Sequence, residues 1–294
     1  MRYPPYAPFA AALCAGALVL TACGSPESAA TGDADGPIKI GLVYSMSGPL
    51  ATYGEQYYQG FEAGLEYATG GTMEVDGRPI EVTTRDDAGD PTKAVSAARE
   101  LIGEGYDIIA GSTASGVAVQ VAPLAEQNKV LFISGPAATD AITGINDYTF
   151  RSGRQTYQDI LAAGSFMDDP EGKNVMVFAQ QNAFGQDNVD AVTTVLEAQG
   201  ATVDSVLAPP DTTDLTPFAE QVRQADPDLL FVAWAGETAS AMWKALNQQG
   251  VLDATEVVTG LDIKASYPVF GEAEARSPSS PTTSTGPRRP KPSR

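Results

Sequence analysis

The stretch that decides the fold contains two apolar runs, IIAGSTASG at residues 108–116 and VLFISGPAAT at residues 130–139, with a helix-like segment between them. A short apolar run that ends in Gly and small hydroxyl residues is typical of a buried parallel strand leading into a helix. Such a turn carries free backbone N–H groups at the positive end of a helix dipole, which suits an anion such as a carboxylate. Because parallel strands end at one edge of their sheet, the two turns predict a crevice that holds a ligand.

Strand-like and helix-like segments alternate on both sides of this stretch. Before residue 140, strands are predicted at residues 38–44 and 80–85 and from residues 108 and 130, with helices at 53–69, 91–104 and 115–128. After residue 154, strands are predicted at 174–178, 202–207, 229–234 and 256–259, with helices at 185–199, 217–224 and 238–249. The alternation predicts an α/β fold of parallel sheets that helices cover on both faces. The turn-rich segment between the two runs predicts two lobes with a cleft between them.

The composition narrows the class of protein. A chain of 294 residues is long enough for one large or two ordinary domains. Its hydrophobic content of 43% and charged content of 19% are typical of a globular protein. A net charge of −19 repels phosphate backbones, so nucleic acid is not an expected partner. The simplest role for this charge is solubility outside the cell.

The chain contains no histidine, and its two cysteines, Cys14 and Cys23, lie in the first 23 residues. The lack of histidine excludes Ser-His-Asp and Cys-His catalysis and removes the commonest metal ligand. The remaining catalytic options are a Ser-Lys pair or paired carboxylates, and neither cleft turn contains a lysine. We therefore expect a protein that is not an enzyme, with no metal, no cofactor and no disulfide in the folded body.

The first 23 residues have the features of an export signal. Arg2 supplies the positive charge, and residues 9–20 form an apolar run too short to span a bilayer stably. The following LTAC, at residues 20–23, resembles a bacterial lipobox, in which the cysteine is lipidated and becomes the mature N-terminus. This predicts an exported protein that a lipid on Cys23 anchors to the outer face of the cell membrane, with residues 24–36 as a flexible tether. The alternative is a buried cysteine in an apolar leader.

These patterns divide the chain into an N-terminal α/β lobe at residues 37–150 and an incomplete C-terminal α/β lobe at residues 151–270. Residues 271–294 are rich in Pro, Ser, Thr and Arg and contain too few large apolar side chains to bury a core, so we expect them to be disordered. They are either a basic Pro-rich tail or the product of a reading frame lost near residue 271.

Five short motifs follow one another in order: IKIG at residues 38–41, MSGPLATYG at 46–54, DDAGDP at 86–91, GSTAS at 111–115 and ISGPAAT at 133–139. In combination they resemble the leucine/isoleucine/valine-binding proteins, the extracytoplasmic substrate-binding subunits of branched-chain amino acid ABC importers. The resemblance covers about residues 37–265. It implies a two-lobed, type I periplasmic-binding-protein-like fold whose lobes close on a branched-chain amino acid, or on a related small amino acid or amide. It also implies a cognate ABC permease in the membrane as partner.

The same resemblance assigns ligand contacts in the N-terminal lobe. Ser115 is expected to meet the ligand carboxylate with its hydroxyl, in front of the helix N-terminus. Ala137, Ala138 and Thr139 are expected to present backbone groups and one hydroxyl to the α-amino and carboxylate groups, and Tyr53 to form an aromatic lid. Each also has an interpretation without a ligand: Ser115 as a helix N-cap, the Ala-Ala-Thr run as an ordinary turn and Tyr53 as a helix-start residue.

In the C-terminal lobe the resemblance assigns Phe184, where relatives usually carry tyrosine, to an aromatic wall. Glu237 or Thr238 falls near a second aromatic position of the family. Asp262 aligns with the acid that pairs with the ligand's ammonium group, because a buried cation without a partner is costly. Without a ligand, Asp262 is a surface loop charge.

Two further functions remain open. The same fold serves as a ligand-sensing receptor or regulator domain, which an attached membrane or DNA-binding segment would favour. Members of the family normally continue past the end of this chain, recrossing between the lobes, so a non-functional truncated fragment is the other alternative. The ligand is also open: branched-chain amino acids lead, but urea, short amides, polyamines and aromatic acids are used by similar proteins.

Overall fold

The computed structural model describes residues 36–165 and 169–260. The export signal, the tether up to residue 35, the tail, Cys23 and Asp262 lie outside the described residues. The predictions made for them therefore remain predictions.

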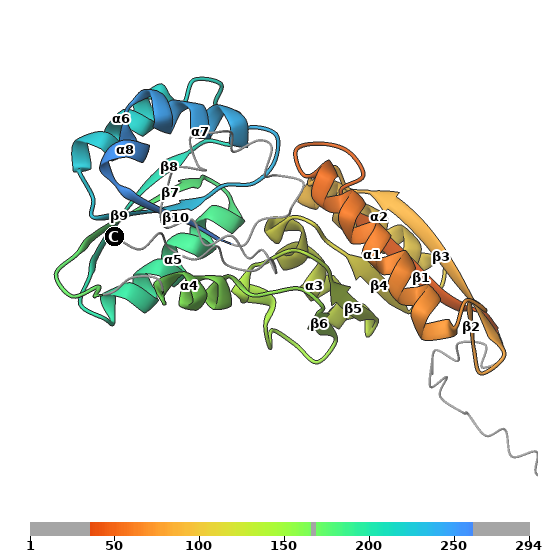
Figure 1. Cartoon of the computed structure of the whole chain (residues 1–294). Coiled ribbons are helices and arrows are strands. Elements are labelled where there is room, and N and C mark those ends of the chain that lie inside the picture. The colour runs from red at the N-terminus through yellow and green to blue at the C-terminus, as the bar shows by residue number, and fades with distance from the viewer. Residues whose placement is uncertain (1–35, 166–168, 261–294) are drawn as a thin grey trace, which may run out of the picture. The chain divides into compact units, whose positions relative to one another are not determined.

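The first sheet has six strands in the order β2-β3-β1-β4-β5-β6 (Figure 1). Its pairs are parallel except β2 with β3, which is antiparallel. The elements of this part are β1 (Ile38–Tyr44), α1 (Ala51–Thr69), β2 (Glu74–Val75), β3 (Arg78–Asp86), α2 (Pro91–Gly103), β4 (Ile108–Gly111), α3 (Ser115–Asn128), β5 (Leu131–Ser134), the 3-10 turn η1 (Asp140–Ile142) and β6 (Thr149–Arg151).

Side chains of the first sheet alternate between two apolar layers, as the period of a strand requires. In β1, Val43 packs into the layer beneath α2 and α3, whereas Leu42 and Tyr44 face the layer beneath α1. The α2/α3 layer is fully buried and contains Leu101 and Phe132. Helix α1 covers the other face with aromatic side chains that are only partly buried, so this face of the sheet has the thinner core.

The turn after β4 depends on an unusual backbone conformation. Gly111 has a φ of 123° and Ser112 a φ of 65°, and the Ser112 N–H donates to the Val43 carbonyl at 2.8 Å. A Cβ atom at Gly111 would lie 1.8 Å from that same carbonyl oxygen, so only glycine fits. The turn thus directs the chain from a buried strand into α3.

The second sheet has four parallel strands in the order β10-β9-β7-β8 (Figure 1). Its elements are α4 (Thr156–Gly164), β7 (Asn174–Gln180), α5 (Ala183–Glu197), β8 (Thr202–Ala208), α6 (Thr216–Ala225), β9 (Leu229–Ala233), α7 (Ala239–Gln248), α8 (Val251–Ala254) and β10 (Glu256–Thr259).

The central strands of this sheet, β7 and β9, are buried on both faces, which explains why they are largely apolar runs. In β7, Val175 and Val177 face α4 and α5, whereas Met176 and Phe178 face α6, α7 and α8. Figure 1 shows the two groups of helices on opposite sides of the sheet. The predicted α/β class with helix-covered parallel sheets is therefore correct.

Several local predictions were wrong, and the short elements β2 and α8 were not predicted. Helix α1 begins at Ala51 and not at residue 53, and the segment predicted as an irregular break contains η1 and the edge strand β6. No element was predicted at residues 155–173, yet α4 occupies Thr156–Gly164. Tyr157 and Leu161 of α4 are 44% and 47% exposed, so its apolar residues do not form a regular one-sided stripe. β6 was missed because it is only three residues long and exposes Phe150.

Within residues 36–165 and 169–260, no helix is both long enough and apolar enough to cross a bilayer.

Two glycines of α1 make a matched test of how this helix meets the sheet. A Cβ atom on buried Gly54 would lie 1.9 Å from the Ser45 carbonyl oxygen, whereas one on exposed Gly60 would meet nothing within 4 Å. We expect Gly54→Ala to lower the free energy of unfolding by about 3 kcal/mol, because backbone would have to move. Gly60→Ala should raise it by about 0.8 kcal/mol through helix propensity. Urea denaturation of both variants checks this, and equal effects would contradict the close packing of α1 on the end of β1.

Candidate functional site

A cavity of about 630 Å³ lies at the carboxyl ends of the strands of both sheets. Its walls come from the segments that follow β1, β3, β4 and β5 in the first sheet and β7, β8, β9 and β10 in the second. Its volume lies within the range of about 300–1,000 Å³ that is usual for small-molecule sites. The cavity occupies the position where open parallel sheets bind ligands, as the strand ends predicted.

The N-terminus of α3 forms one wall of the cavity. Ser115 and Gly116 line it, and the backbone N–H groups of both lack an acceptor within the described residues. The N-cap of α3 is Ala114, so Ser115 is the first helical residue and its hydroxyl does not cap the helix. Ser115 is 4% exposed, and its hydroxyl has no hydrogen-bond partner in the described chain. This wall can therefore donate hydrogen bonds to an anion.

A buried carboxylate supports the neighbouring loop. Asp87 is fully buried, and its Oδ1 accepts from the Ser45 hydroxyl at 2.7 Å and from the Gly89 N–H at 2.7 Å. Its Oδ2 has no partner among the described residues. Burial raises the pKa of Asp87, and the two hydrogen bonds only partly oppose this. Ala88 and Gly89, which follow Asp87, line the cavity with left-handed backbone conformations.

The opposite wall is formed by the ends of β7 and β9. Gln180 is 6% exposed, and its Oε1 accepts from the Ala235 N–H at 3.2 Å. The Thr238 hydroxyl accepts from the Trp234 indole at 2.9 Å, while the Trp234 ring packs 5.2 Å from Phe178. These contacts hold a flat aromatic side chain and a polar amide at the edge of the cavity.

The start of α5 completes this wall with one aromatic and two amide side chains. Asn182 caps the helix by accepting from the Gly185 N–H at 2.9 Å, and Phe184 follows it on the cavity surface. Asn188 lies one turn further along, is 2% exposed and donates to the Phe184 carbonyl at 2.8 Å. The position of Phe184 is therefore held by its own helix.

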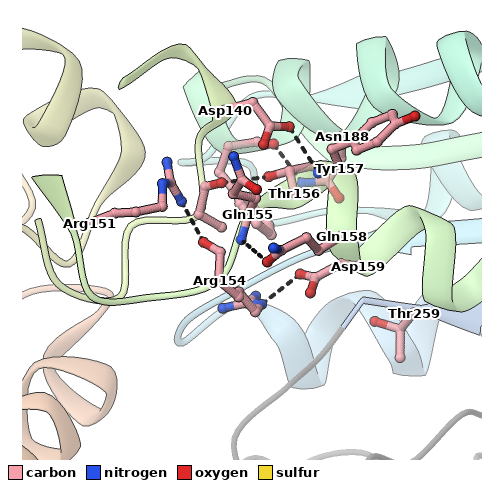
Figure 2. A network of polar contacts seen from close by, with 12 residues as sticks. Asp140, Arg151, Arg154, Gln155, Thr156, Tyr157, Gln158, Asp159, Asn188 and Thr259 are labelled. Carbon is pink, nitrogen blue, oxygen red and sulfur yellow. Dashed lines mark hydrogen bonds and ion pairs between the residues drawn. The ribbon is translucent and has the colours of Figure 1, made fainter. Parts of the chain in front are cut away.

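The segment that joins the two sheets carries a cluster of polar contacts (Figure 2). Arg154 lines the cavity, and its Nε donates to the Asp159 carboxylate at 2.6 Å. Asp159 is 4% exposed, and burial raises the pKa of its carboxyl against the opposing charge of Arg154. Arg151 donates to the Arg154 carbonyl at 2.5 Å and also to the Thr139 carbonyl, so it fixes the backbone on both sides.

The first turn of α4 is tied to the end of β5 by the same cluster. The Thr156 N–H and hydroxyl both donate to the Ala138 carbonyl, at 2.9 and 3.1 Å. The Tyr157 N–H donates to Asp140 at 2.9 Å, as Figure 2 shows. These bonds satisfy N–H groups of the first turn that have no partner within the helix. Helix α4 can therefore begin directly after the segment that joins the two sheets.

The structure brings together most of the residues predicted for the site. Tyr53, Ser115, Ala138, Phe184 and Glu237 all line the cavity.

Ala137 and Thr139 are not among the lining residues. Ala137 is 1% exposed in the α2/α3 core, and the buried Thr139 hydroxyl accepts from the Ala141 N–H and interacts with Asp187 of α5. Asp262 lies outside the described residues. A ligand role for these three residues remains untested.

Sequence reasoning missed Arg154, Gln180 and Asn188. Gln180 carried a usable signal, because it is the polar residue that ends a buried strand. Arg154 carried none, because it follows a three-residue strand in a segment rich in turn formers. Asn188 is a helical residue whose direction depends on how α5 packs. Within the part of the chain that the structure describes, no cluster of three or more His, Cys, Asp or Glu side chains could hold a metal ion.

Comparison with known proteins defines the class. The family model described as "Periplasmic binding protein" matches residues 37–269, and the chain belongs to this family. The curated relatives are named as Leu/Ile/Val-binding proteins. BraC3 of Rhizobium johnstonii is 29% identical over 200 residues, and homolog 3 of Brucella melitensis is 27% identical over 221 residues. These matches confirm the resemblance to the leucine/isoleucine/valine-binding proteins and support the prediction of a binding protein over an enzyme.

Solved structures of solute-binding proteins of ABC transporters also match this chain. An ABC-type branched-chain amino acid transporter protein of Rhodopseudomonas palustris is 36% identical with a TM-score of 0.60, and the match covers 79% of this chain and 66% of that one. A solute-binding protein of R. palustris in complex with 4-hydroxybenzoate is 27% identical with a TM-score of 0.72, covering 80% and 66%. The predicted periplasmic-binding-protein-like fold is therefore correct. The chain covers 53% and 59% of the lengths of the two curated relatives, which is between half and three fifths.

The buried Asp87 predicts a pH dependence of stability. Its raised pKa means that the folded chain holds this proton more tightly than the unfolded chain, so ionisation destabilises the fold as the pH rises from about 4 towards 7. In Asp87→Asn the amide keeps an acceptor for Ser45 and Gly89 but carries no charge. We therefore expect the melting temperature of the variant minus that of the natural chain to be higher at pH 7 than at pH 4.

Asp214→Asn is the control of opposite sign. The Thr216 hydroxyl and N–H lower the pKa of Asp214, so its contribution to stability is present at pH 7 and is lost as the pH falls. The Asp214 variant should therefore become relatively less stable as the pH rises from 4 to 7. If the melting-temperature difference changes with pH in the same direction for both variants, the burial of an ionisable Asp87 does not cause the pH dependence of stability.

Proposed function

We propose that this chain is the extracytoplasmic solute-binding subunit of an ABC transporter, which holds a small amino acid, or a related small carboxylate or amide, in the cavity described above. The observation that carries the proposal is that one cavity is lined by strand ends of both sheets. A ligand there contacts both lobes and stabilises their closed arrangement.

The proposed partners follow from this role. A membrane permease would recognise the closed form, and a lipid on Cys23 would keep the protein at the outer face of the cell membrane. Family membership supports export, since the matched family is one of periplasmic binding proteins. The leader with its LTAC motif supports the lipid anchor.

The residues proposed to hold the ligand are those that the resemblance assigned, and five of them, Tyr53, Ser115, Ala138, Phe184 and Glu237, line the cavity. The Ser115 hydroxyl and the N–H groups at the start of α3 would donate hydrogen bonds to the carboxylate, and Tyr53 and Phe184 would cover the ligand body. Glu237 and Asp262 are the acids available for an ammonium group. Thr139 and Ala137 would act at a distance, through the backbone of the turn that places Ala138 on the cavity wall.

The ligand class rests on similar proteins. Curated relatives are named for leucine, isoleucine and valine, which favours a branched-chain amino acid. Two solved structures, at 27% and 28% identity, hold the same compound, named 4-hydroxybenzoate in one and p-hydroxybenzoic acid in the other. This favours an aromatic acid as the second candidate. Both classes contain a carboxylate and an apolar body.

Thermal melting of the full chain tests the function. The panel contains the branched-chain amino acids, short amides, urea, polyamines and hydroxybenzoates. A ligand at a hundred times its dissociation constant adds about 2.7 kcal/mol of stability, which raises the melting temperature of a chain of this size by about 5–10 °C. We expect at least one compound to produce this rise. A cooperative melt that no compound moves would overturn the proposal.

Ser115→Ala tests the predicted carboxylate contact. Because the hydroxyl has no partner in the described chain, its loss should leave the melting temperature of the free protein within about 1 °C. The dissociation constant of the active ligand should rise by about 3- to 10-fold, the usual worth of one hydrogen bond. The control is Ser96→Ala, an exposed serine of α2 that does not line the cavity. Equal calorimetric affinities for the two variants would remove Ser115 from the site.

A further inference from the structure

Arg154 differs from the other charged residues on the cavity wall. The charged side chains that line the cavity within residues 36–165 and 169–260 are Asp90, Arg154 and Glu237. Asp90 caps α2 by accepting from the Thr92 and Lys93 N–H groups at 2.7 and 3.1 Å. Glu237 is exposed to solvent. Arg154 is thus the cation of the described wall, and its side chain is 31% exposed.

The position of this guanidinium is set from behind by a buried acid. Asp159 on α4 accepts from Nε of Arg154 at 2.6 Å and is itself 4% exposed. An arginine with one edge bound in this way has little freedom to turn towards bulk solvent. The backbone of Arg154 is also held, because its carbonyl accepts from Arg151 at 2.5 Å. Both ends of the residue are therefore fixed.

The free edge of Arg154 is the part that matches a ligand. A guanidinium has five N–H donors, and the contact with Asp159 uses the one on Nε. The two terminal nitrogens, Nη1 and Nη2, have no acceptor among the described residues. Two parallel N–H groups of this kind fit the two oxygens of a carboxylate.

The rest of the wall suits the same ligand chemistry. Ser115 and Gly116 offer further N–H donors at the start of α3, and a helix N-terminus attracts negative charge. The apolar surface is supplied by Leu50, Phe184 and Trp234. The described wall therefore combines several anion-attracting groups with flat apolar side chains, and its acids are either engaged by N–H groups or exposed.

We propose that Arg154 is a specificity-determining residue that binds the carboxylate of the ligand, so that the site prefers an organic acid without an ammonium group over the zwitterionic amino acid of the same skeleton. Asp159 is the positioning residue that holds the guanidinium towards the cavity. This inference rests on the proposed solute-binding function and narrows its ligand class to a monocarboxylate with an apolar or aromatic body.

Two sets of compounds with a common skeleton test the charge preference. The first is 4-methylpentanoate, leucine and leucinamide, and the second is 3-phenylpropanoate, phenylalanine and phenylalaninamide. Titration calorimetry of the full chain should give the acid of at least one set an affinity ten or more times that of its amino acid, with the amide weakest. An amino acid or amide that binds as tightly as its acid would overturn the inference.

Variants of Arg154 connect that preference to the residue. Arg154→Gln should weaken binding of the preferred acid by about 10- to 100-fold and remove its advantage over the amino acid. Arg154→Lys should recover part of the advantage, since the charge remains but the paired donors do not. Arg99→Gln is the control, because Arg99 is exposed on α2 and does not line the cavity. An unchanged acid preference in Arg154→Gln would overturn the assignment.

The single variant leaves Asp159 buried without its cation and could fail to fold. The double variant Arg154→Gln/Asp159→Asn removes both charges and leaves two amides that can bond to each other. It should melt cooperatively and lack the preference for the acid, and a folded double variant that keeps the preference would overturn the inference. If no compound of the two sets binds the natural chain, the inference fails. The proposed function fails as well only if the wider panel also produces no shift.

Discussion

The structure depends on how closely its helices and turns approach the last carbonyl groups of the central strands. A Cβ atom would lie 1.9 Å from the Ser45 carbonyl oxygen at Gly54, 1.8 Å from that of Val43 at Gly111 and 1.8 Å from that of Gln180 at Gly185. Gly54 and Gly185 lie near the starts of α1 and α5, and Gly111 ends β4. Because parallel strands end at one edge, these close approaches bring helix N-termini, small residues and free N–H groups together around one cavity.

Buried carboxylates stabilise the walls from behind. Asp87 ties the loop after β3 to Ser45, and Asp159 holds Arg154 on the segment that joins the sheets. Both have a raised pKa because of burial, and each has one oxygen without a partner among the described residues. Replacing a buried ion pair such as Arg154–Asp159 with apolar side chains of similar volume is often neutral or stabilising. Both carboxylates lie beside the cavity. Ionisable groups with a shifted pKa are common at functional sites, so we infer that these two are kept for the geometry of the binding site.

Much of the fold could be predicted because its central strands are buried on both faces. Continuous apolar runs such as residues 175–178 and 229–234 locate these strands, and the small residues after such runs locate the edge that binds ligands. The edge strand β6 and helix α4 could not be predicted in this way, since both expose apolar side chains and neither has a regular period. In the site, Ser115, Ala138 and Phe184 were predicted because the family resemblance assigned them, and all three line the cavity. Arg154 was missed because its role depends on a contact with Asp159, five residues away on a helix that was not predicted.

The sequence by itself determined the class of protein: the alternation of buried strands and helices, the strand-end turns, the lack of histidine and the five motifs together indicate a two-lobed binding protein. The alternation and the strand-end turns are local features, because each depends on side-chain period or on turn chemistry within a few residues. Only the tertiary structure decided which polar groups face the cavity. It turned Ala137 into the core and Thr139 towards Asp187, and it placed Arg154 in the wall. The direction of a side chain at a strand end depends on what packs behind it, and those contacts join residues far apart in the chain.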